Sequence, residues 1–129
     1  MNNNSVHFSV SHSGGIFACG ASASRRRYVD RVAVDALVGC STVVLESNYD
    51  EKMLLGGSYP PELKERIKSA TGHLSNYDCA AFARYLAENG TKRFMLGHLS
   101  EENNTPEIAL NITSRALKDF DDVIIKVAQ

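Results

Sequence analysis

Two histidines stand in the same local sequence, and each leads into a segment that has the features of a helix start. The tetrapeptide Gly-His-Leu-Ser occurs at residues 72–75 and again at 97–100, which gives His73 and His98 matching surroundings. Imidazole suits metal binding and proton transfer, because its unperturbed pKa lies close to neutral pH. A single histidine in such a loop is more often structural, but the repeated segment favours a shared functional site for this pair.

Polar residues follow both histidines and are candidates for a pocket around them: Ser75, Asn76, Ser100, Asn103 and Asn104. Thr105 and Pro106 have the residue types of an N-cap and a first helical position, so unpaired backbone N–H groups are expected near His98. Helix N-termini attract anions such as phosphate. A polar loop with a well-made cap accounts for the same residues without a ligand.

A third polar cluster follows the apolar run at residues 42–45 and contains Glu46, Asn48 and Asp50. Carboxylates at the end of a strand can orient a histidine, or can accept a hydrogen bond from a residue that binds a metal. Asparagine and aspartate are also common turn formers, which is the simpler interpretation of the same residues.

The segments that carry these residues predict an α/β domain. Apolar runs at residues 41–47 and 92–97 are typical of short strands buried on both faces. Helical patterns between and after these runs, followed by a final strand, give the order β-α-α-β-α-β from about residue 41. A short helical piece is also expected at residues 50–55. His98 then follows a strand by one glycine, at the sheet edge where open α/β sheets bind ligands.

Length, composition, charge and cysteine content limit the class of protein to which this chain can belong. The chain has 129 residues, 43% hydrophobic and 22% charged, which fits one globular domain with a formal net charge of -1. No apolar run approaches the ~18 residues of a membrane span, and the N-terminus lacks the pattern of a signal peptide. Three cysteines without a CxxC pair indicate a reducing compartment. We therefore expect a cytoplasmic protein with no membrane partner.

Residues 1–36 are a divergent N-terminal segment, in which one or two strands around a Ser-Gly-Gly turn and a helix over about Arg26 to Leu37 are expected. From about residue 37 the chain resembles the C-terminal half of a metallo-β-lactamase-fold hydrolase, an αββα sandwich. The segments that carry the resemblance are LESNYDEKML, YPPELKERI, GHLSN and HLSEENNTPEIAL. The most similar branch is that of the WalJ/YycJ-like bacterial DNA exonucleases, and the tRNA 3′-processing endonucleases are more distant.

The resemblance implies metal-dependent phosphodiester hydrolysis with zinc or manganese, and nucleic acid as a partner. By this resemblance, His98 matches the last metal-ligand histidine, and His73 matches a catalytic histidine near the scissile phosphate. The pocket-shaping positions of the family correspond to Ser75, Asn76, Ser100, Asn103 and Asn104. The acidic strand-end motif behind the metal ligands corresponds to Glu46, Asn48 and Asp50.

The chain also departs from the family pattern. The His-x-His-x-Asp-His cluster that binds most of the metal occurs nowhere in the sequence, and neither does the expected Asp-x-Gly before the helix near Arg26. We therefore expect a fragment, from a truncated or frameshifted reading frame, that is inactive alone. Half of a sandwich leaves an apolar face, which predicts self-association or pairing with the missing N-terminal half. The alternatives are a non-catalytic accessory domain and an unrelated α/β domain, so whether the chain is an enzyme stays open.

Overall fold

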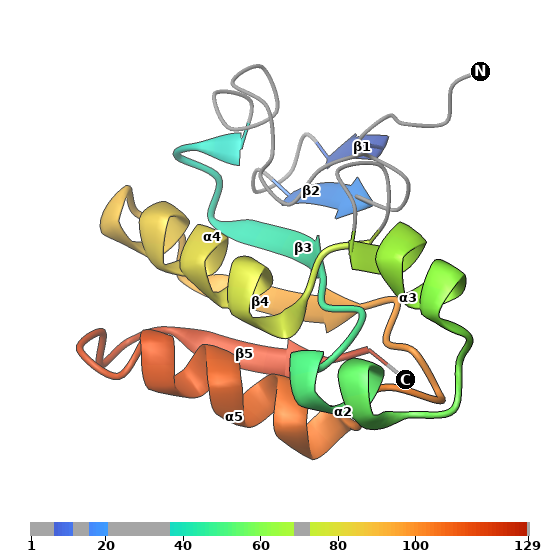
Figure 1. Ribbon diagram of the computed structural model, residues 1–129. Coiled ribbons are helices and arrows are strands. Elements are labelled where there is room, and N and C mark those ends of the chain that lie inside the picture. Colours follow the sequence, from blue (N-terminus) through green and yellow to red (C-terminus); the bar gives the residue numbers. More distant parts are fainter. Residues whose placement is uncertain (1–6, 12–15, 21–36, 69–72, 129) are drawn as a thin grey trace.

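The computed structural model describes the backbone of residues 7–11 and 16–20, and the complete residues 37–68 and 73–128. Five strands form one sheet in the order β1-β2-β3-β4-β5 (Figure 1). β1 is antiparallel to β2, and all other neighbours are parallel. The strands are β1 His7–Ser11, β2 Ile16–Gly20, β3 Thr42–Glu46, β4 Arg93–Gly97 and β5 Ile124–Val127. The helices are α2 Glu51–Gly56, α3 Pro61–Lys68, α4 Asn76–Glu88 and α5 Pro106–Ala116.

The α/β class expected from the sequence is confirmed. Between β3 and β4 the chain forms three helices, because the short helical piece expected at residues 50–55 is a separate helix, α2. Asp50 starts α2 by accepting a hydrogen bond from Met53 N at 3.1 Å. The predicted helix over about Arg26 to Leu37 lies almost entirely outside the described residues.

Side-chain caps fix the starts of the two long helices. Ser75 Oγ accepts from Asp78 N at 3.0 Å, and Thr105 Oγ1 accepts from Ile108 N at 3.1 Å, with Pro106 as the first residue of α5. These bonds satisfy N–H groups that have no partner inside the helix. The cap predicted at Thr105 is therefore confirmed, and Ser75 has the same role for α4.

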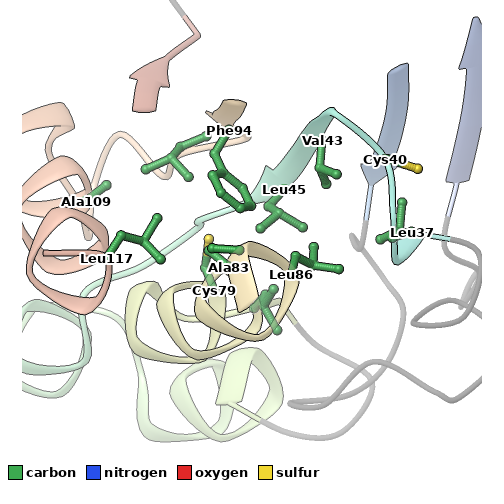
Figure 2. Close-up of a cluster of buried hydrophobic side chains, with 13 residues drawn as sticks. Leu37, Cys40, Val43, Leu45, Cys79, Ala83, Leu86, Phe94, Ala109 and Leu117 are labelled. Carbon is green, nitrogen blue, oxygen red and sulfur yellow. The ribbon is translucent and has the colours of Figure 1, made fainter. Parts of the chain in front are cut away.

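The hydrophobic core lies between the sheet and the two long helices. α4 and α5 pack beside each other against the same face of the sheet (Figure 1). Figure 2 shows Leu45 of β3 and Phe94 of β4 pointing toward Cys79 and Ala83 of α4 and toward Leu117, the C-cap of α5. All five side chains are at most 3% exposed. This layer holds the strand ends, and the loops that follow them, in fixed positions.

The opposite face of the sheet is open where side chains are described, so the prediction of strands buried on both faces is wrong. Val44 and Met95 are half-buried on this face, and Ile124 is 48% exposed. A hollow of about 270 Å³ lies on it, lined by Thr42, Arg93, Phe94, Met95, Ile124 and Lys126. The reason is that α4 and α5 both cover the other face. In the part of the chain that the structure describes, no helix is long and apolar enough to cross a membrane.

Candidate functional site

Glu46, His73 and His98 meet at the carboxyl edge of the parallel strands. Glu46 ends β3 and His98 directly follows β4, while His73 stands just before the cap of α4. One carboxylate oxygen, Glu46 Oε2, lies 2.7 Å from Nδ1 of His73 and 2.7 Å from Nδ1 of His98. The two imidazole rings have centroids 5.2 Å apart and an interplanar angle of 68°. Three segments distant in sequence therefore converge on one oxygen atom.

The contacts decide which ring nitrogens are available for chemistry. An ionised carboxylate only accepts hydrogen bonds, so each histidine donates Nδ1–H to Glu46. Nε2 then remains as the coordinating or proton-transferring atom of each ring. In many metal sites, a histidine that binds the metal through one ring nitrogen donates the N–H of its other ring nitrogen to a carboxylate, which orients the ring.

The donor set also fits a divalent ion. One ligand atom from each of Glu46, His73 and His98 lies within 4.8 Å of the others. Imidazole and carboxylate donors together suit zinc or manganese. Within residues 37–68 and 73–128 no second group of three such ligands occurs, so the described residues provide for one ion.

Burial and hydrogen bonding set the charge state of this cluster. The Glu46 side chain is fully buried, while the side chains of His73 and His98 are 34% and 55% exposed. Burial alone would raise the pKa of Glu46, but the hydrogen bonds from His73 and His98 outweigh it, and the pKa lies below its usual value. The hydrogen bond to Glu46 raises the pKa of His98 despite partial burial. A charge-assisted contact between Glu46 and His98 therefore stabilises the fold.

These shifts predict a pH dependence of stability. The contribution of His98 is complete below its ordinary pKa of 6.5 and is lost as pH rises through the raised value in the folded protein. The contribution of Glu46 is present above its ordinary pKa of 4.5 and is lost only at more acidic pH. Urea unfolding of the metal-free protein should therefore show a free energy of unfolding that falls as the pH rises above 6.5. The slope should be smaller in His98→Asn, which tolerates the same backbone conformation, and parallel curves would contradict the assignment.

His98 has an unusual backbone. Its φ is 57°, and it is the one non-glycine residue with positive φ among the described residues. This left-handed conformation costs about 1–2 kcal/mol for an ordinary L-residue. Strained residues of this kind are kept where the surrounding structure holds them, often at functional sites.

A buried network of amides lies beneath the cluster. Asn76 and Asn104 bond to each other through their side chains at 2.8 and 3.0 Å, and Ser47 Oγ donates to Asn76 Oδ1 at 2.6 Å. Asn104 Nδ2 also donates to the carbonyls of Ser47 and Asn48. The network ties the end of β3 to the starts of α4 and α5, and this rigidifies the edge that carries the histidines.

The remaining predicted site residues make local structural bonds. Ser75 caps α4 and Asp50 caps α2. Ser100 Oγ accepts from the backbone N–H groups of Glu102 and Asn103. Asn103 is 4% exposed, and its carbonyl accepts from Asp50 N at 2.8 Å. The pocket role of Ser75, Asn76, Ser100, Asn103 and Asn104 stays a prediction, as do the catalytic role of His73 and the metal role of His98.

Sequence reasoning missed two features of this site. Ser47 lies between two polar candidates, yet nothing in its type marked it as part of the buried network. The convergence of His73 and His98 on a single oxygen was also not predicted, although Glu46 was identified as a residue able to orient a histidine. The repeated Gly-His-Leu-Ser segment was the signal that the two histidines belong together.

Comparison with known proteins gives relatives for part of the chain. Exodeoxyribonuclease WalJ of Streptococcus pneumoniae serotype 2 is 48% identical over 66 residues, which cover 51% of this chain and 24% of the relative. Exodeoxyribonuclease YycJ of Bacillus anthracis is 37% identical over 92 residues, which cover 71% of this chain and 35% of the relative. No family model matches the chain.

The match thus spans between a quarter and about a third of the length of these relatives. The expected similarity to the WalJ/YycJ-like exonucleases is confirmed at this level. This chain is therefore related in sequence to the exodeoxyribonucleases WalJ and YycJ over one portion of their length.

Proposed function

We propose that this chain carries part of the active site of a metal-dependent nuclease that hydrolyses phosphodiester bonds in DNA. The observation that carries the proposal is the pair of imidazoles held on one buried carboxylate oxygen at the carboxyl edge of the sheet. The sequence relationship to two exodeoxyribonucleases supports DNA as the substrate. We propose further that the sheet is the C-terminal half of an αββα metallo-β-lactamase sandwich, which the open face of β3, β4 and β5 supports.

In this proposal each residue has one task. Glu46 accepts Nδ1–H from both rings, fixes their tautomers and turns both Nε2 atoms away from itself. His98 holds the divalent ion through Nε2, and His73 exchanges a proton at Nε2 with the leaving-group oxygen. A bound zinc or manganese ion would activate water and neutralise charge on the phosphate. Because His98 is the one metal ligand that this proposal assigns among the described residues, we expect the chain alone to be a poor catalyst.

Metal binding is the first test. Purified, metal-free chain should bind at most one zinc ion in a competition titration with a chromophoric chelator. His98→Ala should abolish tight binding, because an essential ligand is lost, whereas Ser114→Ala on the exposed side of α5 should bind like the unaltered chain. Two ions per chain would mean that ligands beyond the described residues complete the site. No binding at all would contradict a metal role for this chain.

Complementation tests the nuclease itself. The chain should be inactive on double-stranded DNA, and it should restore exonuclease activity when mixed with the remaining portion of the Bacillus anthracis relative. His73→Ala and His98→Ala should each abolish the restored activity. Activity that survives both substitutions would exclude the proposed roles.

A second candidate function is a non-catalytic accessory domain that binds DNA without metal. The presence of a single three-ligand group in the described part of the chain favours it. In that case DNA binding, measured by fluorescence anisotropy, should be unchanged by His98→Ala and by a chelator. Loss of binding in both conditions would favour the nuclease instead.

We also propose that the chain associates through its open sheet face, either with itself or with the missing half of the sandwich. Half-buried Val44 and Met95 and exposed Ile124 support this, since such side chains gain from burial in an interface. Light scattering after size exclusion should give a mass above that of one chain, and a clean monomer would contradict self-association.

We also propose a cytoplasmic location for this chain.

A further inference from the structure

The direction of the His98 side chain depends on its backbone conformation. Glu46 pairs in register with Gly97, and side chains alternate between the two faces along a strand. Glu46 therefore points to the same side of the sheet as Val44, opposite α4 and α5, where the two histidines bury it. A residue 98 that continued β4 in extended conformation would direct its side chain to the helix-covered face, away from Glu46. The left-handed φ of 57° at His98 instead accompanies a 2.7 Å contact with Glu46.

Two hydrogen bonds hold the peptide groups on either side of His98. The carbonyl of Gly97 accepts from Ser47 N at 2.9 Å, and the carbonyl of His98 accepts from Asn48 Nδ2 at 2.7 Å. The first bond comes from the backbone, so any residue at position 47 except proline supplies it. The second comes from a side chain, so it depends on the residue type at position 48.

Asn48 is also anchored on both sides by its own backbone. Its N–H donates to the carbonyl of Leu74 at 2.9 Å, and its carbonyl accepts from Ser100 N at 2.8 Å. Asn48 is 8% exposed, so water has little access to compete for these bonds. The backbone of Asn48 is therefore bonded to the segment that carries His73 and to the loop that follows His98.

We propose that Asn48 is a positioning residue, whose side-chain amide holds the His98 carbonyl and so keeps His98 in the left-handed conformation that brings its imidazole to Glu46. Asn48 then acts on the ligand geometry without contacting ion or substrate. The consequence for hydrolysis rests on the proposed function, whereas the consequence for the His98 ring does not.

The experiment compares Asn48→Ala with Thr91→Val in the full chain. Thr91 is a matched control, because its buried hydroxyl donates a hydrogen bond of the same length, 2.7 Å, to the carbonyl of Cys40. Thr91 directly precedes Lys92 and Arg93 at the start of β4, so it lies at the opposite end of that strand from His98. Thr91→Val removes a comparable bond and should leave the histidine cluster intact. Circular dichroism establishes that each variant is folded.

The first readout is nuclear magnetic resonance of the histidine rings without metal. The unaltered chain and Thr91→Val should show Nδ1–H tautomers for both rings and a nuclear Overhauser effect between them. Asn48→Ala should lose this effect, and His98 should adopt the tautomer mixture of a solvated histidine, while His73 keeps its bond to Glu46. Asn48→Asp keeps the shape of the side chain but has no amide N–H, so its histidine spectra should change in the same way. This variant replaces Asn48→Ala in the experiment if Asn48→Ala does not fold.

The second readout is zinc chloride titration. Asn48→Ala should bind zinc about 10–100-fold more weakly than Thr91→Val, the range typical for groups that orient metal ligands. If the unaltered chain binds no zinc, the proposed function fails, but the ring spectra still test the role of Asn48. Unchanged His98 spectra in both Asn48 variants, or an equal change in Thr91→Val, would overturn the inference.

Discussion

Truncation of Phe94 to alanine should lower the free energy of unfolding by about 3–5 kcal/mol. Phe94 is 2% exposed and lies between β4 and the two long helices (Figure 2). Removing the ring loses the free energy gained by burying it away from water. It also leaves a cavity that the close-packed surroundings fill only partly. Since small domains are stable by about 5–15 kcal/mol in total, this loss would unfold a large part of the population at moderate temperature.

The matched control is Tyr85→Ala on α4, because this aromatic side chain is 46% exposed. Urea unfolding followed by circular dichroism should give a much smaller loss for Tyr85→Ala than for Phe94→Ala. Equal losses would mean that the core does not lie where the sheet meets α4 and α5.

Replacing Glu46 with glutamine should weaken zinc binding by about 10–100-fold. Glutamine keeps the volume of the side chain but has one accepting oxygen and no charge. If that oxygen takes the place of Oε2, the amide N–H₂ takes the place of Oε1, which is buried and has no hydrogen-bond partner among the described residues. If the amide is reversed, both imidazoles face a donor. Either arrangement loosens the rings or leaves a buried donor unsatisfied.

Glu102→Gln is the control for this substitution, because it makes the same change of charge in the exposed loop after His98. Chelator competition should give the zinc affinity of the unaltered chain for Glu102→Gln and a weaker affinity for Glu46→Gln. The histidine ring spectra should change in Glu46→Gln alone. A zinc affinity that is the same in both variants would show that Glu46 does not orient the ligands.

Local sequence signals determined most of the secondary structure. A cap such as Thr105 acts within one turn, so residue type and spacing are enough to predict it. The apolar run of β4 followed by a glycine likewise predicted that His98 would stand at the carboxyl end of a strand. Burial on both faces was predicted wrongly for β3 and β4, because apolar content does not say which face the helices cover.

The site itself depended on tertiary structure. Glu46 is 27 positions from His73 and 52 from His98, so no local pattern could show that both rings bond to the same oxygen. Strand pairing in register sets Glu46 beside Gly97, and the bond from Asn48 holds the His98 carbonyl. The sequence by itself determined which residue types stand at each strand end and helix start. Only the packed sheet brought three distant segments to one point, because the positions of parallel strands depend on the whole core rather than on any single segment.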